Sequence, residues 1–123
     1  MLNGKEVERL IIDKGLIKDF IDLKIQVTSN GFDLTIASLS EFKTQGALDF
    51  SNKERSLPQT KEILPRKQNP KDKFGWWDLK KGAYKVKTNE TVSLPHDLAA
   101  LACPRSSLLR MGAFTQTAAW DAG

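Results

Sequence analysis

One stretch near the C-terminal end decides how the rest of the chain is interpreted: Cys103-Pro104-Arg105-Ser106-Ser107-Leu108-Leu109-Arg110-Met111-Gly112. A proline-led turn carries two arginines and two adjacent serines. Guanidinium forks match phosphate oxygens bidentately, and short hydroxyls add hydrogen bonds without bulk. The stretch therefore suits a bound phosphate chain held by Arg105, Ser106, Ser107 and Arg110. Arg-Ser-Ser by itself is also common as a solvated turn or a basic phosphorylation-like site, so the tripeptide alone does not identify a phosphate-binding site.

Further segments extend this pattern over most of the chain. They follow one another in a fixed order, which is more specific than any one of them: Ser29–Leu34, Gly82–Ala102, Pro104–Gly112 and Trp120–Gly123. In these segments the chain resembles the dUTP nucleotidohydrolase and dCTP deaminase superfamily, and its archaeal-type dUTPase branch in particular. The resemblance implies a mostly β fold, a distorted jelly-roll-like β-barrel of the dUTPase-like, β-clip kind, with a short N-terminal helix.

We expect one dUTPase-like domain over residues 1–123 that lacks its C-terminal part. A chain of 123 residues is the size of a single domain. It stops at Gly123, before the tyrosine that usually completes the family's third motif. The fourth and fifth motifs, with the glycine-rich tail that closes over the phosphates, would follow.

Local patterns predict the individual elements. Asn3 and Glu6 form a capping-box pattern, and Gly15 offers a left-handed stop, so a helix is expected between them. Apolar residues alternate with polar ones over 23–27 and 32–36, which predicts strands. Residues 44–73 predict long loops with one short strand at Ile63-Leu64. The alternating runs 84–88 and 91–94 predict a hairpin that turns at Asn89-Glu90.

The resemblance also implies the roles of single residues. Asp33 matches an aspartate that lies near the triphosphate and helps to order the water shell of magnesium. Asp121 matches the aspartate that contacts the deoxyribose and activates the attacking water. Residues 113–121 match the base-binding hairpin, in which Gln116 and Ala118 would contact the base. Taken alone, Asp33 is typical of a solvent-facing side chain beside a turn, and Asp121 of a turn.

The implied reaction is hydrolysis of dUTP to dUMP and pyrophosphate, which limits uracil incorporation into DNA and supplies dUMP. Mg²⁺ would be bound mainly through the substrate triphosphate, so no residue of the chain is assigned as a metal ligand. Asp121 would take a proton from the water that attacks the α-phosphorus. The family is usually a homotrimer with active sites shared between subunits, so Asp33, Ser106 and Asp121 need not meet within one chain.

Two alternatives stay open. A dCTP deaminase, with or without hydrolase activity, shares the fold and the Arg-Ser-Ser-Leu turn. Its pattern has a histidine and an arginine where this chain has Ala118 and Ala119, but Arg110 fits it, and its catalytic glutamate would lie beyond residue 123. The other alternative is a non-catalytic module of the same fold, trimeric or nucleic-acid-binding.

Composition excludes several classes of site. With one cysteine and one histidine, the chain can form neither an intrachain disulfide nor a conventional zinc site. Its apolar runs are too short to span a bilayer, so we expect a cytoplasmic protein without a membrane partner. The formal net charge of +4 is concentrated between Arg66 and Lys81. That segment is compatible with a nucleic-acid surface or an electrostatic funnel, but a solvated loop is the favoured interpretation, so a nucleic-acid partner is not expected.

Overall fold

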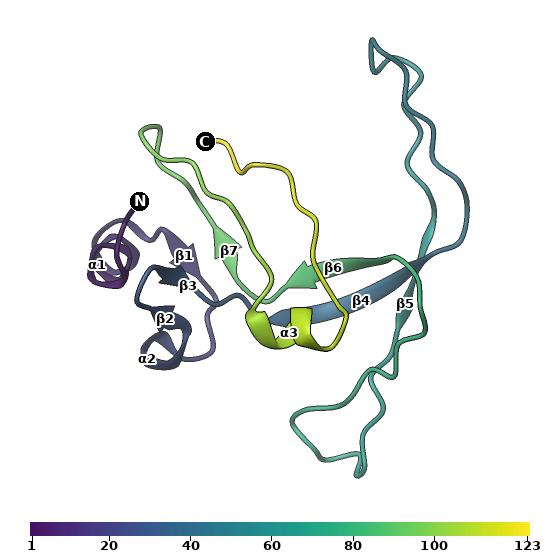
Figure 1. Ribbon diagram of the computed structural model, residues 1–123, viewed down its shortest axis with the longest axis horizontal. Coiled ribbons are helices and arrows are strands. Elements are labelled where there is room, and N and C mark those ends of the chain that lie inside the picture. Colours follow the sequence, from purple (N-terminus) through teal and green to yellow (C-terminus); the bar gives the residue numbers. More distant parts are fainter. The chain divides into compact units, whose positions relative to one another are not determined.

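The computed structural model describes residues 1–123 and divides into two compact units (Figure 1). The terminal unit comprises Met1–Asp33 and Glu90–Gly123, and the central unit comprises Leu34–Asn89. The chain contains seven strands and three helices, which confirms the expected mostly β fold. The strands lie in one three-stranded and two two-stranded sheets, and no barrel closes within these residues.

Helix α1 (Gly4–Lys14) begins and ends as its sequence predicts. The Asn3 N–H donates to Glu6 Oε2 at 2.8 Å, and the Glu6 N–H donates to Asn3 Oδ1 at 3.1 Å. Gly15 ends the helix in the left-handed region, with φ of 64°. This geometry is the capping box followed by a glycine stop, and it confirms the predicted N-terminal helix.

The core of the terminal unit forms on one face of α1. Val7 and Ile11 of the helix pack with Leu16 and Ile17, all four at most 8% exposed. Burial of aliphatic side chains of this size stabilises a fold by roughly 1.5–3 kcal/mol each. The helix therefore contributes a packing surface to the terminal unit.

Two small antiparallel sheets complete the terminal unit. Strand β1 (Ile17–Lys18) pairs with β7 (Thr91–Val92), which joins the two sequence segments of this unit. Strand β2 (Val27–Thr28) pairs with β3 (Gly31–Phe32) through the turn at Ser29-Asn30. Asp33 directly follows β3, so the turn and the strand determine the position of this aspartate.

The strand predicted over residues 23–27 is wrong for most of its length. Leu23–Gln26 forms one helical turn, α2, and only Val27 continues into a strand. Asp22 explains the difference, because its Oδ1 accepts hydrogen bonds from the N–H groups of Lys24 and Ile25 at 2.9 and 3.3 Å. Such an N-cap favours a helical turn over the extended conformation that alternation indicates.

The central unit is a three-stranded antiparallel sheet in the order β5-β4-β6. Its middle strand β4 (Ile36–Phe42) pairs with β5 (Thr60–Ile63) and β6 (Tyr84–Thr88). Leu39 of β4 is 3% exposed and is paired with Ile63 and Val86. Long connections join the strands, so the predicted loops are present. The short strand predicted at Ile63-Leu64 lies earlier, over Thr60–Ile63, and Leu64 is outside it.

The predicted hairpin between residues 84 and 94 does not form. Both strands exist, but β6 pairs with β4 and β7 pairs with β1. The two residues expected in the turn instead make hydrogen bonds to residues distant in the sequence. The Asn89 N–H donates to Thr35 O at 3.0 Å, and the Glu90 carboxylate accepts from Gln26 Nε2 at 2.7 Å. Glu90 is 5% exposed, so a buried polar contact replaces the solvated turn.

The third helix, α3 (Ser106–Arg110), belongs to the terminal unit and, with its N-cap residue Arg105, carries the predicted phosphate-binding residues. None of the three helices has the length and apolar character needed to cross a bilayer.

Candidate active site

The predicted phosphate-binding residues lie on and beside α3. Arg105 is the N-cap residue, extended at φ of −62° and ψ of 147°, and its carbonyl accepts from the Leu108 N–H at 2.9 Å. Ser106 and Ser107 form the start of the helix and Arg110 its end. All four residues are exposed. The turn therefore presents two guanidinium groups and two hydroxyls to solvent on a single short element.

An ion pair brings Asp33 to this element. Arg105 Nη1 lies 3.0 Å from Asp33 Oδ2. The Asp33 side chain is 27% exposed and that of Arg105 is 70% exposed. The carboxylate is therefore the more buried partner, and most of the guanidinium surface stays accessible to solvent. Two of the residues assigned through the family resemblance thus meet in the structure.

The backbone of Asp33 is held by a residue that the sequence patterns did not single out. The Asp33 N–H donates to Gln26 O at 2.8 Å, and the Asp33 carbonyl accepts from Gln26 Nε2 at 2.9 Å. The alternation over residues 23–27 had placed Gln26 on the polar, outward side of a strand. In the structure it is 4% exposed. A buried glutamine must satisfy its amide, but nothing in a single sequence shows which polar residue is buried.

The remaining predicted residues are not joined to this cluster within the chain. Asp121 is exposed, and no hydrogen bond or ion pair connects it to Asp33 or Arg105. Gln116 and Ala118 are exposed as well. The structure therefore brings together Asp33 and the α3 residues, and it leaves Asp121 and the base-binding residues apart.

The hairpin expected over residues 113–121 does not form. This segment has no regular strand, and its pairing is limited to the bridge between Trp120 and Ala100, with N···O distances of 2.9 and 3.0 Å. Alanine, threonine and glutamine at 115–119 are all exposed. Small side chains bury little apolar area, so the segment contributes few contacts that would fix it as a hairpin.

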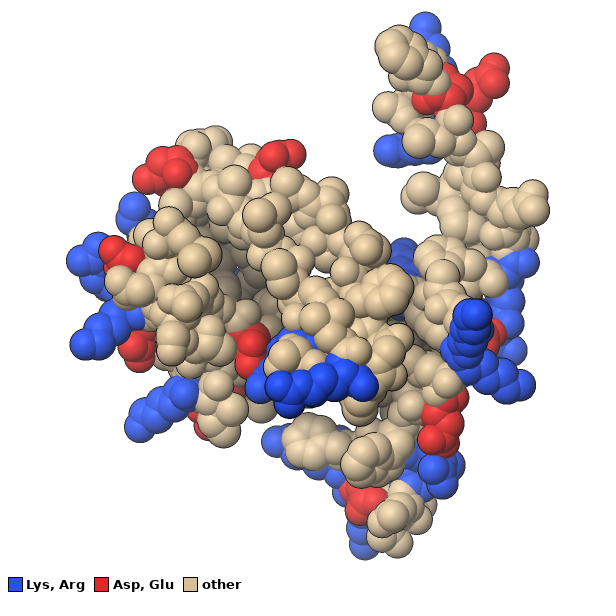
Figure 2. Space-filling view, in the orientation of Figure 1, with Lys and Arg blue, Asp and Glu red and all other residues tan.

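Charge at the cluster is predominantly positive. Figure 2 shows basic side chains gathered over α3, which carries Arg110 and follows Arg105. A guanidinium has five N–H donors in a planar fork, and the ion pair with Asp33 uses one side of Arg105 only. The remaining donors are available to anionic oxygens such as those of a phosphate.

The side chains do not form a metal site by themselves. No group of three or more His, Cys, Asp or Glu residues is placed to hold a metal ion. Asp33 is the acidic side chain in contact with the predicted phosphate-binding residues. Any cation bound here would need most of its ligands from another source, such as phosphate oxygens and water.

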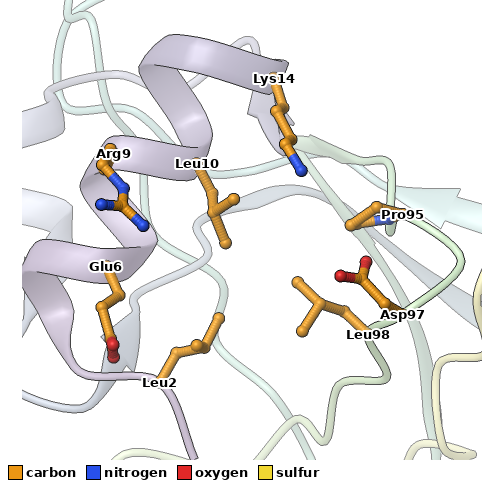
Figure 3. A pocket seen from close by; sticks show the side chains of 8 residues that line it. All are labelled: Leu2, Glu6, Arg9, Leu10, Lys14, Pro95, Asp97 and Leu98. Atoms are coloured by element: carbon orange, nitrogen blue, oxygen red, sulfur yellow. The ribbon is translucent and has the colours of Figure 1, made fainter.

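Two cavities of the molecule are lined by residues outside α3. One of about 240 Å³ opens in the terminal unit between α1 and the turn at Pro95–Leu98 (Figure 3). Leu10 and Leu98 point into it, and the charged ends of Lys14 and Asp97 approach it from opposite sides (Figure 3). Another of about 150 Å³, in the central unit, is lined by Arg66, Gln68 and Trp76. Neither is lined by a predicted site residue.

Comparison with known proteins agrees with this arrangement of motifs. The dCTP deaminase-like family matches residues 1–123. A probable deoxyuridine 5'-triphosphate nucleotidohydrolase of Archaeoglobus fulgidus is 43% identical over 123 residues, which are 100% of this chain and 68% of that protein. A probable enzyme of the same name from Methanosarcina mazei is 41% identical over 124 residues, covering 100% of this chain and 69% of the relative.

A more distant relative carries the same name. The deoxyuridine 5'-triphosphate nucleotidohydrolase of Methanocaldococcus jannaschii is 35% identical over 116 residues, covering 93% of this chain and 71% of that protein. No solved structure matches the chain. The family match over all 123 residues, together with these identities, confirms the resemblance seen in the motifs. The chain belongs to the dUTPase and dCTP deaminase superfamily.

Proposed function

We propose that this protein is a dUTP diphosphatase that hydrolyses dUTP to dUMP and pyrophosphate in the cytoplasm, in a magnesium-dependent reaction. The observation that carries the proposal is the contact of Asp33 with Arg105 at the N-terminal end of α3. It places an acidic side chain beside an exposed group of phosphate-binding type. The relatives named deoxyuridine 5'-triphosphate nucleotidohydrolases support the choice of substrate.

The residues of α3 bind the triphosphate. Arg105 and Arg110 offer guanidinium forks, and Ser106 and Ser107 offer hydroxyl donors. These groups stabilise the negative charge that develops on the phosphate oxygens in the transition state. All four are exposed, so a triphosphate can reach them without rearrangement of a core.

Asp33 fits a role beside the triphosphate. Its carboxylate is largely covered and held against Arg105, and carboxylate oxygens accept hydrogen bonds from metal-bound water. When bound, magnesium supplies positive charge that offsets the charge of the triphosphate. Because the chain offers no cluster of metal ligands, we assign the ion mainly to substrate oxygens and Asp33 to its hydration shell.

Asp121 accepts the proton of the attacking water, and Gln116 and Ala118 face the base. Within one chain, Asp121 has no hydrogen bond or ion pair with Asp33 or Arg105, which favours a site completed by another subunit. We therefore propose a homotrimer in which each active site combines residues of different subunits.

A dCTP deaminase, alone or in addition to the hydrolase, is the second candidate. The match to the dCTP deaminase-like family favours it, and Arg110 fits the deaminase pattern. Ala118 and Ala119 argue against it, because they carry no polar group where that pattern has histidine and arginine. A non-catalytic module of the same fold would bind nucleotides without converting them.

One assay separates these candidates. The purified protein is incubated with magnesium and either dUTP or dCTP, and the products are resolved by chromatography. Release of dUMP and pyrophosphate from dUTP supports the hydrolase, whereas a uracil nucleotide formed from dCTP supports the deaminase. Binding of both nucleotides without turnover would refute both enzymatic assignments and leave the module.

A further inference from the structure

Every donor and acceptor of the Gln26 side-chain amide is hydrogen-bonded. Its Oε1 accepts from the N–H groups of Ile21 and Asp22 at 2.7 and 2.9 Å. Its Nε2 donates to Asp33 O at 2.9 Å and to Glu90 Oε1 at 2.7 Å. An amide has two acceptor lone pairs and two N–H donors, so each has a partner. Glu90 helps to orient the amide, together with the Asp33 carbonyl at Nε2 and the two backbone N–H groups at Oε1.

This network fixes the backbone of Asp33 from two sides. The N–H of Asp33 donates to the main-chain carbonyl of Gln26, and the carbonyl of Asp33 accepts from the Gln26 side chain. Rotation of the peptide groups around Asp33 would break one or both bonds and leave the buried amide of Gln26 without a partner, and a buried polar group without a partner costs roughly 1–3 kcal/mol. The direction of the Asp33 side chain, toward Arg105, is therefore set by Gln26.

Stability alone is a poor explanation for this pair. Gln26 and Glu90 are 4% and 5% exposed, and burial of a carboxylate is costly even when it is hydrogen-bonded. Apolar residues of similar volume often stabilise a core as well as buried polar groups do. What apolar residues could not provide is a donor aimed at the Asp33 carbonyl.

We propose that Gln26, oriented by Glu90, is a positioning residue that holds the carboxylate of Asp33 at the triphosphate site. The proposal rests on the proposed function, because it is the role of Asp33 beside the triphosphate that makes its direction matter. Gln26 is 4% exposed, so its side chain does not present a surface to a ligand. It acts through Asp33, and loss of its amide donor lets Asp33 turn away from Arg105.

A swap of the two side chains separates positioning from stability. Gln26→Glu alone places two carboxylates together and turns an oxygen toward the Asp33 carbonyl. The double variant Gln26→Glu with Glu90→Gln restores an amide–carboxylate pair with the donor on residue 90. The carboxylate introduced at position 26 can still accept from the two backbone N–H groups at residues 21 and 22. Among the hydrogen bonds of Gln26, the swap removes the one to the Asp33 carbonyl.

The first readout is independent of activity. Thermal unfolding should show that the double variant recovers most of the midpoint lost in Gln26→Glu. Amide hydrogen exchange at Asp33 should nevertheless be on the order of 10-fold faster than in the parent, because its local opening is easier. The Gly15 amide, which donates to Ile11 O at 3.0 Å, serves as the unaffected control. Unchanged protection of Asp33 in the double variant overturns the proposal.

The second readout is kinetic. In the double variant, kcat for dUTP should fall on the order of 10-fold, and the magnesium concentration for half-maximal rate should rise. Adding the swap to Asp33→Asn should cause no further loss, because a residue acting through Asp33 is not additive with it. A full additive loss, or a double variant with the parental rate, overturns the positioning role. If the parent hydrolyses no dUTP, the proposed function fails, and hydrogen exchange at the Asp33 amide still decides whether Gln26 fixes this residue.

Discussion

The carboxylate of Asp33, the residue after β3, lies 3.0 Å from the guanidinium of Arg105, the residue at the N-cap position of α3. The two residues come from the two sequence segments of the terminal unit, which β1 and β7 join. Because the guanidinium is 70% exposed, the pair is open on the side from which a phosphate would approach. Because one side of the pair is open to solvent, its contribution to stability is small, and its proposed role is in ligand binding.

Replacement of Arg105 by lysine should weaken triphosphate binding while the fold is kept. Lysine preserves the charge but loses the planar fork that binds two oxygens at once. We expect kcat/KM for dUTP to fall by about 100-fold, which corresponds to about 2.7 kcal/mol of transition-state stabilisation. Steady-state kinetics at saturating magnesium measure this loss.

Arg66→Lys is the matched control for that variant. Arg66 also pairs with an aspartate, Asp78, at 3.0 Å, and both side chains are exposed. It lies in the central unit, outside the predicted phosphate-binding residues. We expect kcat/KM within about twofold of the parent, since a change at an exposed pair has little energetic effect. An equal loss in both variants would mean that general charge, and not the α3 turn, binds the substrate.

Asp33→Asn should separate activity from stability. The amide keeps the shape of the side chain and removes the charge that pairs with Arg105. Because the guanidinium side of the pair is open to solvent, the pair contributes about 0–1 kcal/mol, and the free energy of unfolding in urea should change by no more than that. The magnesium concentration for half-maximal dUTP hydrolysis should rise, because the hydration shell of the ion loses a charged acceptor. A normal magnesium dependence would remove Asp33 from the site.

Elements whose signals are local could be predicted from the sequence. Asn3, Glu6 and Gly15 each act on a neighbouring turn of the backbone, so the limits of α1 follow from residue types alone. The phosphate-binding character of Arg105 and its neighbours also follows from residue types within one short segment, and that segment is exposed in the structure. The family resemblance added Asp33, whose contact with Arg105 the structure then provides.

Strand partners and the buried amide could not be predicted in this way. The alternation over residues 84–94 is satisfied equally by a hairpin and by strands in separate sheets, and β6 pairs with β4 instead of β7. Alternation over residues 23–27 likewise ignores the side chain of Asp22, which caps a helical turn. Glutamine is a residue type that mostly lies at the surface. The burial of Gln26 is explained by its hydrogen-bond partners at Ile21, Asp33 and Glu90, which the structure reveals.

Gly4→Ala should destabilise the terminal unit strongly. A Cβ at this position would lie 2.0 Å from the carbonyl oxygen of Thr28, which belongs to β2. The Gly4 N–H also donates to Ser29 O at 2.9 Å, so the helix start cannot move away without losing that bond. Overpacking against backbone costs about 1–3 kcal/mol, and urea unfolding should show a loss at the upper end of this range.

Gly31→Ala provides the comparison for Gly4→Ala. A Cβ at Gly31 would meet its nearest atom, Thr28 Oγ1, at 4.0 Å, which is ordinary contact. Its φ lies outside the left-handed region, so alanine fits without strain. We expect the free energy of unfolding to change by less than about 0.5 kcal/mol. Equal destabilisation at both positions would contradict the close approach of α1 to the turn between β2 and β3.

Asp121→Asn should abolish dUTP hydrolysis without preventing nucleotide binding. A carboxamide cannot accept a proton from the attacking water, and general-base catalysis contributes about 100-fold to 10,000-fold. Because Asp121 is exposed and has no hydrogen bond or ion pair in the chain, the variant should unfold at the parental temperature. Calorimetric titration with dUTP should give a dissociation constant within about threefold of the parent, since the α3 groups that we propose to bind phosphate are untouched. Asp97→Asn, also exposed but lining the cavity beside α1, should keep full activity, and hydrolysis by Asp121→Asn at the rate of this control would rule out Asp121 as the base.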